Sequence, residues 1–477
     1  MQGFIETVER VNNQVNSFAW GPVMLTLLVG TGIYLTIRLG FLQCTHFGYI
    51  LKNTIGTLFS GKKSGENGNN LSPFQAVTTA LAGTVGTGNI AGVTGAIITG
   101  GPGAVFWMWF SAFFGMVTKY AEIALAVRYR TVDEDGVHHG GPMYYIEKGL
   151  GKGWKWLSVI FAVLGGLASF GIGNMSQGNE IAGSMKDLFG VSPIVTGILL
   201  AAVVAVVILG GVKRIGTVTS YLVPFMSVFY IAAGIVIILM KLPAIPGVLA
   251  DICKSAFTFR AAAGGAAGYA VMTAMRMGVA RGVFSNEAGL GSAPIAHAAS
   301  STEEPCEQAM WGVFEVFVDT IVICTITALA ILLSGVFDRT VGVDSRMIFG
   351  DVAAGALFTS KGSAAAAAFN TILPGEIGGT IIQISLLCFA LSTIISWSYY
   401  GLTCWEYVTG GSKMVSLVYR IVFSLVCIVG AIGSGQLMWD ISDTLNGLMA
   451  IPNLIALLLL SGTVISLTKK YFSEAGK

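Results

Sequence analysis

Long apolar segments recur from one end of the chain to the other, and short polar stretches separate them. A helix needs about 20 apolar residues to cross a hydrocarbon layer of about 30 Å. Eleven segments meet this length, at residues 20–40, 72–99, 103–128, 155–183, 192–210, 217–240, 264–298, 309–335, 377–407, 415–433 and 441–467. The pattern predicts an all-α polytopic membrane protein. Because no long polar linker divides the chain, we expect one domain over residues 1–477.

The composition supports a membrane location. Only 11% of the residues are charged, against roughly 25% in a typical soluble protein, and the mean hydropathy is +0.75. The lipid bilayer is therefore an expected partner. The net charge of +2, without a basic stripe, excludes nucleic acid as a partner.

Lys and Arg are distributed unevenly between the two sets of loops. If the N-terminus lies outside, the cytoplasmic loops and the C-terminus hold sixteen of these residues and the outer side holds eight. Since basic residues favour the cytoplasmic side, we expect a multi-pass protein of the plasma (inner) membrane. Its N-terminus should lie outside and its C-terminus in the cytoplasm.

Glycine is unusually frequent, with 63 of 477 residues, and two apolar segments combine it with polar residues. The first segment has Gly83, Gly86, Gly88 and Gly92 around Thr84, Thr87 and Asn89. The second has Gly278, Gly282, Gly289 and Gly291 together with Thr273, Arg276, Arg281, Ser285, Asn286 and Glu287. We predict broken helices near 83–92 and 278–291. Broken helices at matching places in two halves of a chain are typical of secondary transporters built from inverted repeats.

A helix that breaks inside the membrane offers backbone N–H groups beside backbone carbonyls. The N–H groups suit an anion and the carbonyls suit a cation, so a zwitterionic amino acid fits both. Carbonyl and hydroxyl oxygens are also suitable ligands for Na⁺. Glycines can instead allow close helix packing, and for Gly92 and Gly95 we favour packing; packing does not explain Thr87 and Asn89.

Two further segments place polar groups in the membrane. Phe389, Ser392 and Thr393 lie at i, i+3 and i+4 and therefore share one helical face. Their hydroxyls could equally bond back to their own helix. Gln177 lies in another apolar segment, where its amide could hold a polar group of a substrate.

At these residues the chain resembles the alanine or glycine:cation symporter family, sodium-coupled amino-acid carriers of the amino acid–polyamine–organocation superfamily with the LeuT fold. The motifs that carry the resemblance are GTVGTGNIAGV, GGPGAVFWMWFSAFFGMVTKYAEIALAVRYR, HGGPMYYIEKGLG, GGAAGY and GVFSNEAGLGSAP. The resemblance implies a five-plus-five inverted repeat with one extra N-terminal helix. The extra helix would be at 20–40, the first repeat at 72–240 and the second at 264–467.

The resemblance also implies site residues. The sodium site would use the carbonyls of Ala82, Val85 and Phe389 and the hydroxyls of Ser392 and Thr393. The substrate would contact Thr84, Gly86, Thr87, Gly88, Asn89, Gln177, Met272, Thr273, Met275 and Gly278, with Trp397 as a wall. A second sodium ion is possible at Thr84, Asn89 and Thr273, or these residues serve the substrate.

Four charged residues inside apolar segments are expected to organise or gate the second broken helix. They are Glu122, Arg276, Arg281 and Glu287. Relatives with the LeuT fold have a glutamate like Glu122 that accepts hydrogen bonds from the unwound helix. Lys119, three residues earlier, is a candidate partner of Glu122.

We therefore expect sodium-coupled symport of a small neutral amino acid, alanine or glycine, into the cell by alternating access. Sodium is the coupling ion, and neither an organic cofactor nor a catalytic residue is expected. Alternatives that the sequence leaves open are glutamine or another neutral amino acid as substrate, and coupling to protons. A polytopic membrane enzyme is a remote alternative, because no catalytic motif is present.

Overall fold

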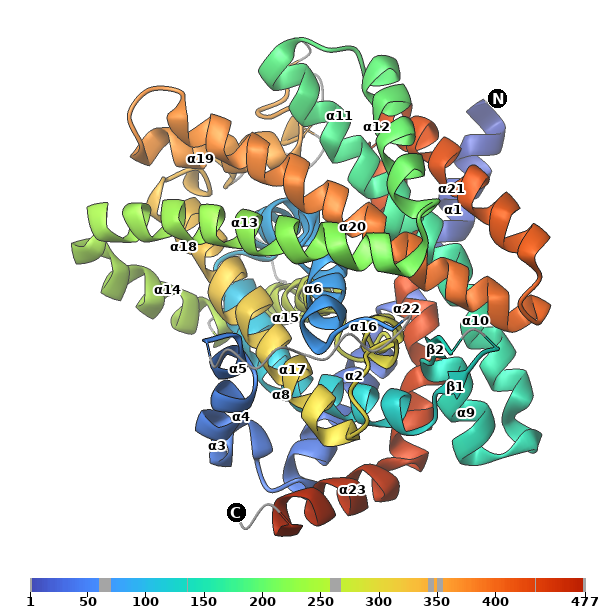
Figure 1. The fold of residues 1–477 in the computed structure, drawn as a ribbon. Helices are drawn as coiled ribbons and strands as arrows, with labels where there is room; N and C mark the ends of the chain where they lie inside the picture. The colour runs from blue at the N-terminus through green and yellow to red at the C-terminus, as the bar shows by residue number, and fades with distance from the viewer. Residues whose placement is uncertain are drawn as a thin grey trace.

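The structure is a computed structural model that describes residues 2–59, 70–134, 136–257, 267–341, 347–349, 355–433 and 435–474. It is mostly helical (Figure 1). The first three residues of the expected segment 264–298 lie outside the described residues, as do five of the basic residues counted above, namely Lys62, Lys63, Arg260, Arg346 and Lys477.

The N-terminal half contains thirteen α-helices and one small hairpin among the described residues. The helices are α1 (Gln2–Ala19), α2 (Pro22–Arg38), α3 (Leu42–Thr45), α4 (Phe47–Asn53), α5 (Ile55–Phe59), α6 (Pro73–Thr84), α7 (Val93–Gly100), α8 (Gly103–Arg128), α9 (Pro142–Leu150), α10 (Lys155–Phe170), α11 (Ser176–Phe189), α12 (Pro193–Ile208) and α13 (Gly211–Met240). The hairpin pairs β1 (Thr131–Val132) antiparallel with β2 (His138–His139).

The C-terminal half contains ten α-helices among its described residues. Its α-helices are α14 (Ile245–Phe257), α15 (Ala267–Asn286), α16 (Ala293–Ala298), α17 (Pro305–Val316), α18 (Thr325–Leu333), α19 (Lys361–Ile372), α20 (Ile377–Thr409), α21 (Lys413–Ile432), α22 (Gly435–Leu459) and α23 (Ser461–Glu474). Three π-helical turns, η1 (Gly88–Gly92), η3 (Gly171–Met175) and η5 (Phe317–Cys324), and three 3₁₀ turns, η2 (Lys152–Trp154), η4 (Leu242–Ala244) and η6 (Asp338–Thr340), complete the helical elements.

The helices follow the apolar segments closely. Among the described residues, eight helices are long and apolar enough to cross a membrane, and the bent pair α6 and α7 brings the number to nine. The apolar helix α12 is shorter, with 16 residues. One expected segment, 441–467, is wrong as a single helix, because α22 ends at Leu459 and α23 begins at Ser461.

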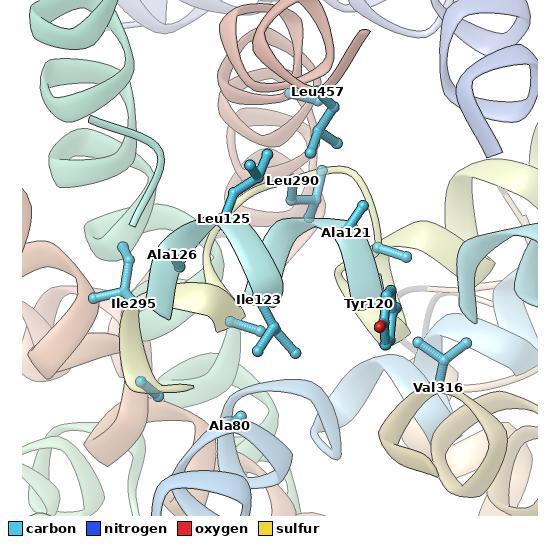
Figure 2. Packing of buried hydrophobic residues seen from close by; sticks show 14 of the residues in the cluster. Ala80, Tyr120, Ala121, Ile123, Leu125, Ala126, Leu290, Ile295, Val316 and Leu457 are labelled. Atoms are coloured by element: carbon cyan, nitrogen blue, oxygen red, sulfur yellow. The ribbon is translucent and has the colours of Figure 1, made fainter. Parts of the chain in front are cut away.

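Helix α8 lies at the centre of the larger apolar core. Figure 2 shows Tyr120, Ala121, Ile123, Leu125 and Ala126 of α8 among apolar side chains of its neighbours. These neighbours include α6, α16, α17 and α22. A helix that is apolar on all sides must be buried, and 83% of the most apolar part of α8 is buried.

The peripheral helices instead present apolar side chains outward. Val206 of α12, Phe225 and Val228 of α13 and Leu425 of α21 are each at least 55% exposed. Such a large apolar surface is unfavourable in water, and it fits a hydrocarbon environment.

Candidate functional site

The first broken helix lies where the sequence predicts it. Helix α6 begins with a capping box in which Ser72 and Gln75 bond each other's backbone N–H groups at 3.1 Å, and it ends at Thr84. Residues 85 and 86 are not helical, and the axis bends by 45° between α6 and the following helix. The Asn89 Oδ1 atom accepts the Gly86 N–H at 2.8 Å, so a side chain replaces a helical hydrogen bond at the break.

The break in this helix touches α20 at Thr393. The Thr393 hydroxyl lies 3.0 Å from the Ala82 carbonyl oxygen and 2.9 Å from the Phe389 carbonyl oxygen. Ser392 Oγ also donates to the Phe389 carbonyl, at 2.8 Å. The structure thus brings together four of the five residues expected to bind sodium, and Val85 follows α6 directly.

The approach is close enough to require glycine in the break. A Cβ atom on Gly86 would lie 2.4 Å from Thr393 Oγ1, a distance that real Cβ contacts do not reach. The possible metal ligands gathered here are carbonyl and hydroxyl oxygens without a formal charge. Hard cations prefer oxygen ligands. The residues present therefore fit a sodium ion.

Gln177 of α11 also reaches this break. It lies just after the π-helical turn η3; its Nε2 donates to the Ile172 carbonyl at 2.9 Å, and its Oε1 accepts the Thr87 N–H at 3.3 Å. The Thr87 hydroxyl is buried and has no hydrogen-bond partner among the described residues. Thr84, by contrast, uses its hydroxyl within its own helix, bonding the carbonyls of Ala80 and Leu81 at 3.3 Å.

Asp319 is a site residue that the sequence analysis missed. It lies on the π-helical turn η5 and is fully buried. Its Oδ1 accepts hydrogen bonds from Asn89 Nδ2 at 2.6 Å and from Ser285 Oγ at 3.1 Å, and its Oδ2 accepts one from Thr320 Oγ1 at 2.7 Å. In the part of the chain that the structure describes, no Lys, Arg or His forms an ion pair with it. A carboxylate inside the apolar segment 309–335 is a signal that could have identified it.

The second broken helix is partly different from the prediction. Helix α15 continues to Asn286, and the non-helical part covers residues 287–292. Gly289 and Gly291 have positive φ there, as does Glu287 at +57°. Gly278 and Gly282 lie instead within the helix, where added Cβ atoms would be 2.3 Å from the Ala104 carbonyl oxygen and 2.7 Å from Ser111 Oγ. These two glycines allow α15 to pack closely against α8.

Four expected substrate contacts are therefore misplaced. Gly278 precedes the break by nine residues, or roughly 13 Å at 1.5 Å per residue, and Met272, Thr273 and Met275 lie farther away. The Met272 side chain is 58% exposed. The residues of α15 that contact the first break are Phe284 and Ser285, because a Cβ on Gly88 would lie 3.1 Å from Phe284 and 3.3 Å from the Ser285 Cα.

Glu122 contacts the second break directly. Its Oε1 accepts hydrogen bonds from the Gly291 N–H at 3.1 Å and from Asn453 Nδ2 at 2.5 Å. The pairing expected between Lys119 and Glu122 is wrong. Lys119 Nζ donates to the Asn286 carbonyl at 2.6 Å and forms an ion pair with Glu315 at 3.1 Å, and all three groups are buried.

Glu287 and Trp397 connect the second break to α20. The Trp397 indole N–H donates to Glu287 Oε1 at 2.8 Å, and Ser292 Oγ donates to Glu287 Oε2 at 2.6 Å. Trp397 is fully buried. It packs on the π-helical turn η3, where a Cβ on Gly173 would lie 2.3 Å from the Trp397 Cβ.

The two arginines of α15 do not contact its break. Arg276 is exposed, and its Nη2 atom lies 3.4 Å from Asn16 Oδ1. Arg281 forms a two-pronged ion pair with Asp443 of α22, at 2.8 and 2.5 Å. Beside this pair the rings of Phe284 and Trp439 stack with their centroids 5.0 Å apart. Helices α15 and α22 are therefore in contact on the N-terminal side of the second break.

Comparison with protein families identifies relatives along the whole chain. The model of the family described as "Sodium:alanine symporter family" matches residues 5–477. The chain is 51% identical to the sodium/alanine symporter AgcS of Methanococcus maripaludis, with 96% of each chain covered. It is 39% identical to the probable sodium/glutamine symporter GlnT of Bacillus subtilis, covering 99% of this chain and 93% of GlnT.

A third relative and a solved structure add to the comparison. The putative sodium/proton-dependent alanine carrier YrbD of Bacillus subtilis is 39% identical, with 96% of this chain and 91% of YrbD covered. The structure of MhsT in complex with L-phenylalanine superposes with a TM-score of 0.55 at 14% identity, covering 84% of this chain and 99% of MhsT. This likeness shows a fold shared with the LeuT-type transporters.

Proposed function

From the premise that the chain belongs to the sodium:alanine symporter family, we propose that it carries alanine or glycine into the cell together with Na⁺ by alternating access. Family membership makes it a membrane transporter for sodium-coupled amino-acid symport and not an enzyme. The choice of amino acid and the transport mechanism are the parts that we propose.

The observation that carries the proposal is the contact between α6 and α20 at Thr393. Its hydroxyl bonds one carbonyl of each helix, Ala82 and Phe389, at 3.0 and 2.9 Å. Sodium placed among these oxygens would replace the hydroxyl as the group that joins the two helices. The ion would then order the adjacent break, so that each ligand raises the affinity of the other.

The break beside this sodium site supplies the groups for the amino acid. We assign the substrate carboxylate to the N–H groups at the start of η1, where the helix dipole favours negative charge. The Thr87 hydroxyl, which has no hydrogen-bond partner among the described residues, and the Gln177 amide would complete the contacts. Trp397 of α20 would limit the side chain to a small size. Glutamine is the second candidate, because the relative GlnT is named a sodium/glutamine symporter.

Asp319 is proposed as the acidic member of a second cation site. Its carboxylate lies within hydrogen-bond distance of Asn89 and Ser285, one residue from each broken helix. A second sodium ion would compensate its charge, and a proton would do so equally. Proton coupling therefore stays the alternative to a second sodium ion.

Alternating access requires the site to open on one side at a time. The ion pair of Arg281 with Asp443 and the stacked rings of Phe284 and Trp439 join α15 to α22 on one side of the breaks. With the N-terminus outside, this is the extracellular side, and we propose that these contacts separate when the carrier opens outward. The five-plus-five repeat within a single domain is part of this proposal.

Transport into proteoliposomes tests the function. Uptake of labelled alanine, glycine, glutamine and leucine is measured at fixed pH with sodium, lithium or choline outside. We expect alanine and glycine to accumulate only with sodium. Equal uptake in choline, or uptake driven by a pH gradient alone, would contradict sodium coupling, and preferred uptake of glutamine would select the second candidate.

A further inference from the structure

A separate cavity lies at the end of α20 away from the contact with Phe389. Its volume is about 130 Å³. Its walls come from the β1–β2 hairpin, from the junction between α12 and α13, and from helices α20 and α21. Tyr399 of the cavity follows Thr393 by six residues, or roughly 9 Å along the helix. The cavity is therefore distinct from the site at the breaks.

Two polar atoms of the cavity residues have no hydrogen-bond partner among the described residues. Tyr399 is 5% exposed and lines the cavity, and its hydroxyl forms no hydrogen bond with any described residue. The buried Nε of Arg420, also a lining residue, is likewise without a partner among the described residues. An unsatisfied buried polar group costs about 1–3 kcal/mol, so two of them in one cavity indicate a ligand that accepts hydrogen bonds.

The same walls carry negative charge. Glu406 lines the cavity, and its Oε1 accepts from Ser416 Oγ at 2.8 Å. Asp133 also lines it; its two oxygens accept from the Val137 N–H and contact His139 Nε2, both at 2.8 Å. Two carboxylates beside one guanidinium disfavour a simple anion, because like charges repel at short range.

A small zwitterion matches both halves of this lining. We propose that the cavity binds a small α-amino acid, with its carboxylate at Arg420 Nε and the Tyr399 hydroxyl and its ammonium group facing Glu406. The cavity volume of about 130 Å³ corresponds to only a few water molecules, because one water takes up about 30 Å³ in the liquid. A space of this size suits an amino acid with a short side chain. This assignment rests on the proposed function, which supplies the substrate class and places the hairpin on the cytoplasmic side.

The position gives such a site a consequence for transport. The hairpin and the α12–α13 junction belong to the proposed first repeat, whereas α20 and α21 belong to the second. A bound amino acid would join these parts and slow their separation. The cavity is then a sensor of the amino acid that has accumulated in the cytoplasm.

Equilibrium dialysis of the purified full-length protein with labelled alanine tests the site. The background variant is Asn89→Ala, and sodium is omitted, so that binding at the breaks is suppressed. We expect residual binding that Tyr399→Phe or Arg420→Gln weakens by about tenfold or more, as expected for the loss of a hydrogen bond to a charged group. Tyr407→Phe is the matched control, because Tyr407 lies on the same helix but bonds Glu147 at 2.5 Å instead of lining the cavity.

Competition identifies the ligand class. Unlabelled alanine and glycine should displace the label, whereas acetate and ethylamine at the same concentration should not. The proposal is overturned if no sodium-independent binding occurs, if both cavity variants bind like the control, or if acetate alone competes as well as alanine. Each cavity substitution is also made in the chain that keeps Asn89. Sodium-driven uptake by these variants reports on folding and on the proposed function separately, because that activity depends on the breaks.

Discussion

Asn89 and Asp319 form a 2.6 Å hydrogen bond between the first broken helix and the π-helical turn η5. The same Asn89 side chain accepts the Gly86 N–H at 2.8 Å. One amide therefore links the shape of the break to a buried carboxylate. A cation bound at Asp319 would act on the break through this amide.

Asp319→Asn tests whether this carboxylate serves the coupling ion. The substitution keeps the size of the side chain and removes its charge. We expect the sodium concentration for half-maximal alanine uptake to rise by about tenfold or more, the scale of a lost interaction with a charged group. The control is Asp338→Asn, which alters an exposed carboxylate after the same membrane crossing. An unchanged sodium titration in proteoliposomes would exclude Asp319 as a cation ligand.

Thr393→Ala tests the sodium site between α6 and α20. The variant lacks the hydroxyl that bonds Ala82 and Phe389. We expect the sodium concentration for half-maximal alanine uptake to rise by roughly tenfold, since a hydrogen bond is worth about 1 kcal/mol and a metal ligand more. The order of preferred amino acids should stay the same. Thr403→Ala is the matched control, because that hydroxyl donates to the Tyr399 carbonyl of its own helix. If both variants titrate alike, the ligand assignment fails.

The sequence predicted the first break and the Thr393 face because their signals are local. Glycines next to Thr87 and Asn89 interrupt one helix, and the i, i+3, i+4 spacing in α20 places its oxygens on one side. The predicted second break begins too early along the chain, because glycine has two uses. Gly289 and Gly291 provide positive φ, whereas Gly278 and Gly282 accommodate α8. Only tertiary packing separates these two uses.

Asp319 could not be predicted as a site residue for a different reason. The apolar pattern of its segment predicts an ordinary membrane crossing, although a carboxylate there is costly unless neighbours satisfy it. Those neighbours, Asn89 and Ser285, lie 230 and 34 residues away in the sequence. The spacing of residues along one segment cannot reveal such a meeting.

Gly86→Ala tests the close approach of the break to α20. The added Cβ would lie 2.4 Å from Thr393 Oγ1, and relieving such overpacking costs about 1–3 kcal/mol. We expect alanine uptake to fall by at least about tenfold while the protein stays monodisperse in size-exclusion chromatography. Gly183→Ala is the control, because a Cβ there would meet no other described part of the chain within 4 Å outside the backbone of its own helix. Wild-type uptake by the Gly86 variant would show that the break does not approach α20 during transport.

The ion pair of Arg281 with Asp443 is expected to act as a closing contact. Its side chains are 11% and 13% exposed, so removal of one partner leaves a poorly solvated charge. Arg281→Ala and Asp443→Ala should each slow uptake severely. The exchanged pair Arg281→Asp with Asp443→Arg should recover part of the rate. Failure of the exchanged pair alongside normal folding would mean that the two residues act independently.

Trp397 is expected to set the size of the substrate. Trp397→Ala should let larger neutral amino acids compete with labelled alanine, because it removes a buried wall beside the break. Trp397→Phe keeps most of the wall but removes the N–H that donates to Glu287 at 2.8 Å. We expect this second variant to keep its selectivity for small side chains and to lose transport rate, because the second break is no longer held to α20. Competition by alanine, leucine and glutamine in both variants separates the two roles, and an unchanged panel in Trp397→Ala would remove Trp397 from the substrate site.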